Sequence, residues 1–119
     1  MAPAEKAGVL LLHLKKRAEF LAANAGKRVS TAAFNLQALN RNDDTPAIRV
    51  GFTCSKKVGN AVARNRAKRR LREVARRVIP EQGQNGWDYV LIGKPNVTAS
   101  RLFTDLQNDL SQALKRLHP

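Results

Sequence analysis

The segment that decides the fold is SKKVGNAVARNRAKRRLREVARRV, residues 55–78. Asn60 is a residue type that favours a helix N-cap, and Pro80 predicts a helix stop, so a helix of about 19 residues is expected between them. Apolar residues recur within it at helical spacing and predict a buried face. These residues are Ala63, Ala67, Leu71, Val74 and Val78.

Positive charge is concentrated on the rest of this helix. The segment contains ten Lys or Arg residues and one acidic residue, Glu73. At about 100° per residue, polar side chains fall opposite the apolar face or beside it. The opposite positions are Asn65, Arg69, Arg72 and Arg76, and the flanking positions are Arg64 and Arg70. One acid cannot neutralise ten bases, so the pattern predicts contact with a polyanion and disfavours a self-neutralised surface helix.

The whole chain has the same charge character. Its 119 residues include 22 basic and nine acidic side chains, for a net charge of +13, and 43% are hydrophobic. Length and composition predict one domain, residues 1–119. The charge favours nucleic acid as the partner, with an anionic membrane as the weaker alternative. Helices that bind membranes or calmodulin need bulky apolar anchors, whereas this apolar face is rich in alanine.

The sequence contains no recognisable export or membrane signal. The longest apolar run, Val9 to Leu12, is far shorter than a membrane span, and Glu5 together with the basic residues after the run argues against a signal peptide. The single cysteine, Cys54, excludes an internal disulfide. These features predict a cytoplasmic protein that does not enter a membrane.

The segments before the basic helix predict an arm, a helix and two strands. Residues 1–13 show no clear period and are expected to form a loosely ordered arm. Lys15 to Ala25 favours a short helix, with Gly26 just beyond its end. Residues 29–39 alternate from Ala32 onwards and predict a strand. The segment IRVGFTCS, residues 48–55, predicts a second strand, paired antiparallel with the first across a turn at residues 40–47.

The segments after the basic helix predict one more strand and one more helix. Trp87 to Gly93 is apolar on both faces, as in an interior strand. Ser100 to Leu117 has a helical apolar face that begins at Phe103. The expected order is therefore α-β-β-α-β-α, an α+β fold with helices packed on a small sheet.

Catalytic chemistry is not predicted from these residues. The chain contains no phosphate-binding glycine loop and no paired-histidine zinc motif, and its two histidines, His13 and His118, lie near opposite ends. Cys54 is expected in the core, and Asp43 with Asp44 in a solvated turn. The other candidate carboxylates, Asp88, Asp105 and Asp109, are not selected by any pattern. We therefore expect no protein active site, no metal ligands and no small-molecule substrate.

The residues alone leave the kind of nucleic acid open, with RNA favoured. A DNA-reading helix usually belongs to a helix-turn-helix, and no partner helix is expected shortly before this one. An RNA-recognition fold would carry several aromatic residues in its strands, whereas residues 48–55 contain only Phe52.

One segment closely resembles a known family. Residues 49–76, RVGFTCSKKVGNAVARNRAKRRLREVAR, are similar to the signature of the protein subunit of bacterial ribonuclease P. The match centres on SKKVGNAV (55–62) and on RNRAKR (64–69). LKKRAEF (14–20) and DYVLIGKP (88–95) also resemble family segments. The similarity in the order of elements extends over roughly residues 13–117.

This resemblance implies both a fold and a function. The fold would be an αβββαβα-type α+β sandwich with a left-handed crossover on a mixed, mostly antiparallel sheet. The chain would be a cytoplasmic RNA-binding protein that binds the catalytic RNA subunit and precursor tRNA and promotes endonucleolytic removal of the 5′ leader. The RNA subunit would be the catalyst and would use Mg²⁺. A general RNA-binding or ribosome-binding protein remains the alternative, and a protein-only nuclease is disfavoured by the scattered acidic residues.

The resemblance also implies two sets of contact residues. The set expected to bind the RNA subunit is Lys56, Lys57, Asn60, Arg64, Asn65, Arg66, Arg69 and Arg70. The set expected to bind the leader, in a cleft between the first helix and the sheet, is Lys16, Arg17, Phe20, Phe34, Leu36, Arg49, Phe52, Lys68 and Arg72. The three phenylalanines of the second set are equally compatible with a place in the core.

Two positions depart from the family pattern. Asn24 stands where a second aromatic residue is common in the first helix, and Gln37 stands where the first strand often carries a tyrosine. Stacking of a base on an aromatic ring contributes roughly 1–3 kcal/mol. We therefore expect leader contacts in this chain to depend more on charge and hydrogen bonds.

Overall fold

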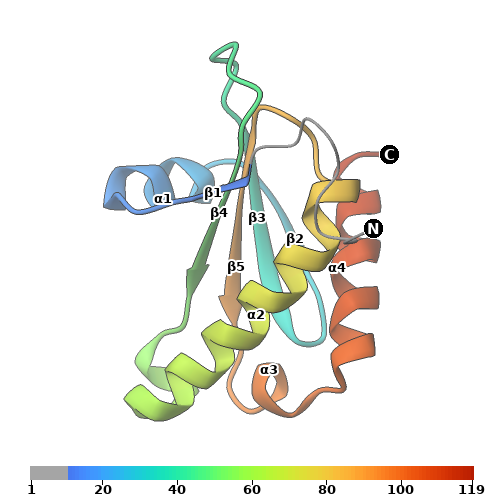
Figure 1. The fold of residues 1–119 in the computed structure, drawn as a ribbon. Coiled ribbons are helices and arrows are strands. Elements are labelled where there is room, and N and C mark those ends of the chain that lie inside the picture. The colour runs from blue at the N-terminus through green and yellow to red at the C-terminus, as the bar shows by residue number, and fades with distance from the viewer. Residues whose placement is uncertain (1–10) are drawn as a thin grey trace.

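The computed structural model describes residues 11–119 as a five-stranded mixed sheet with helices on both faces (Figure 1). The elements are β1 (Leu11–His13), α1 (Arg17–Asn24), β2 (Lys27–Ser30), β3 (Phe34–Asn40), β4 (Ile48–Thr53), the 3-10 turn η1 (Lys56–Val58), α2 (Ala61–Gln82), β5 (Trp87–Gly93), α3 (Val97–Ser100) and α4 (Phe103–Leu117). The α+β class is confirmed. Apart from β1, η1 and α3, the order is αβββαβα, as the resemblance implied.

The strand β5 lies at the centre of the sheet, whose order is β1-β4-β5-β3-β2. It pairs in parallel with β4 and antiparallel with β3, as expected of a strand that is apolar on both faces. The prediction that β3 and β4 pair with each other was wrong because β5 lies between them. The loop that joins β3 to β4 passes the start of β5, where Arg41 N–H donates to Gly86 and Gly86 N–H donates to Ala47.

The prediction of a single strand over residues 29–39 was also wrong. These residues form the β2–β3 hairpin, in which Lys27 lies opposite Ala38. The hydroxyl of Thr31 closes the turn, because it donates to the carbonyl of Phe34 at 2.8 Å and accepts from the N–H of Phe34 at 3.1 Å. Alternation alone does not reveal such a turn, since the small residues after Thr31 continue the pattern.

The edge strand β1 corrects the prediction for the N-terminal arm. Leu11–His13 pairs in parallel with β4, with Leu11 opposite Ile48, and is therefore not a loose arm. The rest of the predicted arm, residues 1–10, lies outside the described residues.

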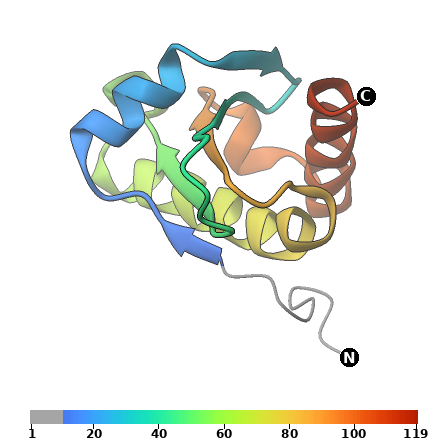
Figure 2. The same cartoon turned by 90° about the horizontal axis from the view of Figure 1, so that it is seen from above.

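The helices cover the two faces of the sheet unequally (Figure 2). Helices α2 and α4 pack on one face, and the main core lies beneath them. Helix α1 covers part of the other face through a smaller cluster that includes Phe20, Ala23 and Val90. The predicted apolar face of α2 is confirmed, with Ala67, Leu71, Val74 and Val78 buried and Ala63 half-buried.

The crossover from β4 through α2 to β5 is left-handed, whereas nearly all parallel crossovers are right-handed. In Figure 1 both strands run downwards, α2 lies in front of them, and β5 stands to the right of β4. Helix α2 lies on the face of the sheet opposite to α1, so its side chains that point away from the sheet also point away from α1.

Three helix boundaries differ from the predictions. Helix α1 is shorter, with Lys16 as its N-cap. Helix α2 continues through Pro80 to Gln82, because Ile79 and Pro80 are buried and their packing offsets the one hydrogen bond that proline cannot make. The predicted helix from Ser100 is divided into α3 and α4 by extended backbone at Arg101.

None of the helices within residues 11–119 is long and apolar enough to cross a bilayer.

Candidate RNA-binding surfaces

The two halves of α2 differ in how their charges are paired. In the C-terminal half, Glu73 accepts from Arg76 at 2.6 Å and from Arg77 at 2.9 Å, and these hydrogen bonds lower the pKa of Glu73 to about 2. Before Glu73, the structure of residues 11–119 shows no acidic partner for Arg64, Arg66, Lys68, Arg69 or Arg72. The unneutralised charge is therefore concentrated at the start of the helix.

The start of α2 is built by side-chain caps. Asn60 Oδ1 accepts from the N–H of Ala63 at 2.9 Å, and Ser55 Oγ accepts from the N–H of Lys57 at 3.3 Å. The first turn contains no acidic residue, so the positive end of the helix dipole adds to the nearby arginines. Lys56 and Lys57 are exposed beside this end. Asn60, predicted as an RNA contact, thus has a structural role as the N-cap.

A shallow hollow on the outward side of α2 is lined by Asn65, Lys68, Arg69 and Arg72. Two of these residues were predicted to bind the RNA subunit and two to bind the leader. The structure brings them together on one surface, which we call the α2 basic surface and define as these four residues together with Arg66. The α2 basic surface combines four cations with one amide, which suits phosphates and an adjacent base or ribose.

Arg70 borders the α2 basic surface, in a hollow that it shares with Arg66 and Arg69, but its donors are used within the protein. Its Nε donates to the carbonyl of Thr98 at 3.0 Å, and its Nη2 donates to the carbonyl of Arg101. The side chain therefore holds the junction between α3 and α4 against α2, and the prediction that Arg70 mainly contacts RNA is corrected. Arg64 is half-buried, and its Nε is a buried nitrogen without a hydrogen-bond partner among the described residues.

The second surface is the face of the sheet beside α1. Phe20 packs directly over Gly51, where an added Cβ would come within 2.6 Å of the ring, so only glycine permits this contact. Lys16 and Arg17 are exposed at the start of α1. A hollow of about 500 Å³ crosses β2, β3 and β5, and two of its lining residues, Arg28 and Gln37, bind Asn24 at the other end of α1. Its lining residues are Arg28, Val29, Ser30, Asn35, Leu36, Gln37 and Ile92.

The two residues that depart from the family pattern contact each other at this hollow. Gln37 Nε2 donates to Asn24 Oδ1 at 2.8 Å, and Arg28 Nη2 donates to the same oxygen at 3.0 Å. These two bonds orient the Asn24 amide, so that its NH₂ group points away from them. We call Asn24, Arg28 and Gln37 the amide cluster. Sequence reasoning missed Arg28, because only the β2–β3 hairpin brings it opposite Gln37.

Several residues predicted to bind the leader are not available to it. The side chains of Phe34 and Leu36 are completely buried beneath α2 and α4, so they cannot contact the leader as predicted. Leu36 borders the hollow beside β2 and β3, but its side chain is not exposed there. Phe52 packs on the α2 face of β4, opposite to Phe20, and the two rings cannot line one cleft. The spacing of two along a strand places Phe52 with Val50 on the core face, whereas Arg49 and Gly51 face α1.

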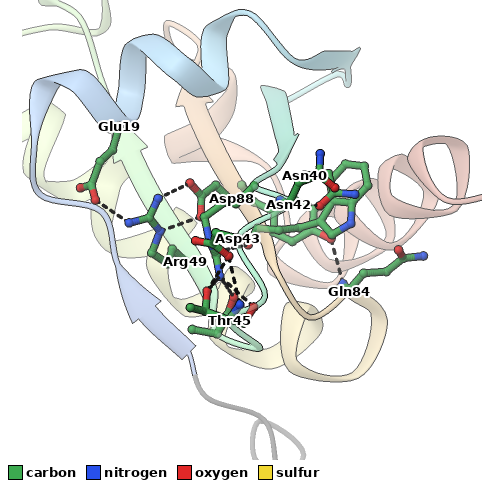
Figure 3. A network of polar contacts seen from close by, with 12 residues as sticks. Glu19, Asn40, Asn42, Asp43, Thr45, Arg49, Gln84 and Asp88 are labelled. Carbon is green, nitrogen blue, oxygen red and sulfur yellow. Dashed lines mark hydrogen bonds and ion pairs between the residues drawn. The ribbon is translucent and has the colours of Figure 1, made fainter.

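Arg49 is bound within the protein (Figure 3). Its guanidinium contacts Asp88 at 2.6 Å and Glu19 at 2.5 Å, and Asp88 also accepts from Arg41 at 2.8 Å. The hydrogen bond to Asp88 raises the pKa of Arg49. Its assignment to the leader is therefore corrected to a structural link between α1, β4 and β5.

The described carboxylates do not form a metal site. Within residues 11–119, no three His, Cys, Asp or Glu side chains come close enough together to hold an ion. Asp88 binds two arginines, and Asp109 binds Arg101 at 2.6 Å. Cys54 is buried in the core as expected, and burial raises the pKa of its thiol.

Known proteins with similar sequences share one description. The profile of the family described as Ribonuclease P matches residues 11–118. The ribonuclease P protein component of Ruegeria pomeroyi is 58% identical over 106 residues, which cover 88% of this chain and 85% of that protein. The ribonuclease P protein component of Gluconacetobacter diazotrophicus is 53% identical over 104 residues, covering 87% and 88%.

Solved structures show a similar fold. The Staphylococcus aureus RNase P protein, at 28% identity, superposes with a TM-score of 0.71 over 89% of this chain and 94% of that chain. The Thermotoga maritima RNase P protein, at 27% identity, superposes with a TM-score of 0.69 over 87% and 94%.

Proposed function

This chain belongs to the ribonuclease P protein family, and on that premise we propose that it binds the catalytic RNA subunit and the 5′ leader of precursor tRNA. It is a protein component of ribonuclease P, an endoribonuclease of tRNA processing. The observation that carries the proposal is the α2 basic surface. Its cations lack acidic partners in the described residues, and they are mounted on a helix whose other side is buried.

The two surfaces suit two different contacts. The α2 basic surface is rich in arginine, which favours the phosphates of a folded RNA with many helices, and we assign it to the RNA subunit. The sheet face beside α1 combines one half-buried ring, Phe20, with the amide cluster and the exposed cations Lys16 and Arg17. Single-stranded RNA presents bases and backbone together, so we assign this face to the leader.

We propose that the chemical step belongs to the RNA subunit and to Mg²⁺ bound by RNA phosphates. Mg²⁺ is held through oxygen ligands, usually one or two carboxylates together with phosphates and water. Because Asp88 and Asp109 already bind arginines, the described residues do not fit a protein-held ion. The chain's own contribution is then to bind and position RNA. We propose that it works in the cytoplasm, where precursor tRNA is made.

Reconstitution tests this function. The catalytic RNA from the same organism is transcribed, mixed with the protein, and given a precursor tRNA at a low Mg²⁺ concentration. We expect slow cleavage by the RNA alone and rapid release of an intact leader by the mixture, because the protein supplies positive charge that Mg²⁺ otherwise provides. If the protein binds the RNA but leaves cleavage unchanged, it is a general RNA-binding protein and the proposal fails.

A further inference from the structure

Another hollow lies on the α2 side of the sheet, between the edge strand β1 and α2. The contacts assigned above do not explain it. Its volume is about 170 Å³. We call it the β1–α2 notch; it is lined by Leu11, His13, Val50, Phe52, Arg72, Ala75 and Arg76. The apolar members Val50 and Ala75 are buried and form its floor.

The walls of the notch are aromatic rings and a cation. The rings of His13 and Phe52 lie 6.1 Å apart and are tilted by 53°, so they form two sides of a wedge. The Arg72 guanidinium lies 5.7 Å from the centre of the Phe52 ring. Phe52 is half-buried and His13 is exposed, so both rings are accessible from solvent.

We propose that the β1–α2 notch holds one unpaired nucleobase of the catalytic RNA subunit. The volume is below the roughly 300–1,000 Å³ of sites for larger ligands, which fits a single flat ring system. Rings and arginine planes are the groups on which unstacked bases pack. A base inside a double helix is stacked on its neighbours and cannot enter, so the base must be unpaired.

We expect the base to come from RNA whose phosphates already contact α2, because the notch and the α2 basic surface share one cation. Arg72 lines both the notch and the hollow of the α2 basic surface. A strand whose phosphates contact Lys68 and Arg69 therefore reaches the notch within the length of one helical turn. The inference rests on the proposed function, because it names a contact made by the surface assigned to the RNA subunit.

The base requires a small movement of Arg72. A flat ring stacked between Phe52 and the guanidinium needs about 7 Å between them, two layers of about 3.5 Å. The present separation is 5.7 Å. Arg72 is exposed, so its flexible side chain can move outward and then cover the second face of the base.

The test uses the full-length protein and the catalytic RNA transcript, with variants that change a ring but not a charge. Phe52→Leu keeps an apolar side chain and removes the ring. Trp87→Leu is the matched control: Trp87 is also half-buried beneath a cation, with Lys27 5.5 Å from the ring centre, but it lines neither the notch nor the hollow of the α2 basic surface. His13→Ala removes the second ring at an exposed position, where loss of folding is not expected. Circular dichroism checks that each variant is folded.

We expect Phe52→Leu and His13→Ala each to weaken RNA-subunit binding about 3-fold or more, with an unchanged salt dependence. Trp87→Leu should change binding by less than about 2-fold. In chemical probing of the RNA bases, one unpaired base protected by the native protein should become reactive with both ring variants.

Three results would overturn the inference. If both ring variants bind like Trp87→Leu with the native probing pattern, the notch holds no base, although the proposed function stands. An effect confined to precursor-tRNA binding by the assembled enzyme would assign the notch to the substrate. If the native protein does not bind the transcript at all, the proposed function itself fails and the inference fails with it.

Discussion

The guanidinium of Arg49 and the carboxylate of Asp88 form a two-pronged ion pair across neighbouring parallel strands. Nε contacts Oδ1 at 2.8 Å and Nη2 contacts Oδ2 at 2.6 Å, and the two residues stand opposite each other in the register of β4 and β5. Asp88 is 1% exposed. Together with Arg41 and Glu19, the pair joins the β3–β4 loop, the central strands and α1 (Figure 3).

Replacing Asp88 should therefore destabilise the fold. Asp88→Ala leaves two arginines next to a buried site without their acceptor, and removing one partner of a buried pair typically costs about 3–5 kcal/mol. We expect a loss of that order in the free energy of unfolding, measured by urea denaturation. Glu81→Ala removes one negative charge at an exposed helical position and should change stability by less than about 0.5 kcal/mol. Equal losses would contradict the structural role of Asp88.

Adjacent arginines on α2 should respond differently to the same change. Arg70→Ala removes donors from the carbonyls of Thr98 and Arg101 and should lower the free energy of unfolding by about 1–3 kcal/mol. Arg69→Ala should leave stability within about 0.5 kcal/mol but weaken RNA binding and lower the salt slope by about one. Thermal unfolding and filter binding at several salt concentrations measure the two effects. If Arg70→Ala changes the salt slope more than Arg69→Ala does, Arg70 contacts RNA directly.

Asn65 tests whether the α2 basic surface recognises more than charge. Asn65→Ala is neutral, and we expect it to weaken RNA-subunit binding about 2- to 10-fold through the loss of one or two hydrogen bonds. Asn108→Ala makes the same change at an exposed position of α4 and serves as the control. Arg101 is unsuitable as a comparison because it binds Asp109 at 2.6 Å. Equal affinities of the two variants would mean that the surface acts through charge alone.

The amide cluster should affect the leader and not the tRNA body. Gln37→Ala removes the bond that orients Asn24, and we expect the assembled enzyme to bind precursor tRNA about 2- to 10-fold more weakly. Its affinity for mature tRNA, which lacks the leader, should not change. Gln112→Ala on α4 is the matched exposed control. An equal loss for both tRNAs would place the cluster outside the leader contact.

His118 should make stability depend on pH. The hydroxyl oxygen of Tyr89 accepts from the N–H of Gln84 at 2.9 Å and lies 2.7 Å from His118 Nε2, to which it can donate its proton when His118 is neutral. Burial, and then the charge of Lys27, lower the pKa of His118 below its ordinary value of 6.5. The folded state therefore binds fewer protons than the unfolded state between the two pKa values.

The stabilising contribution of neutral His118 is complete above pH 6.5 and is lost as the pH falls through the folded pKa. We expect the free energy of unfolding to decrease with falling pH in this window, by less than about 1.4 kcal/mol per pH unit for one proton. His118→Phe should flatten this part of the profile in urea titrations. An unchanged slope in that variant would assign the pH dependence to other groups.

Much of this molecule follows from local patterns in its sequence. The spacing of Ala67, Leu71 and Val74 determines the buried face of α2, and Asn60 determines where that helix begins, because capping and amphipathic periodicity are local properties. The doubly apolar pattern of Trp87–Gly93 likewise identifies the central strand. The family resemblance at residues 49–76 then supplies the order of elements and the kind of partner.

Other features depend on contacts between residues far apart in the chain. No local pattern shows that β5 separates β3 from β4, that Arg70 and Arg49 are bound within the protein, or that Phe20 and Phe52 lie on opposite faces of one strand. Nor does it show that Asn24 meets Gln37 or that His13 meets Phe52. The sequence by itself determines which residues can bind RNA, since charge and periodicity belong to each segment. The tertiary structure decides which of them remain available, because pairing and burial are settled only when the segments pack together.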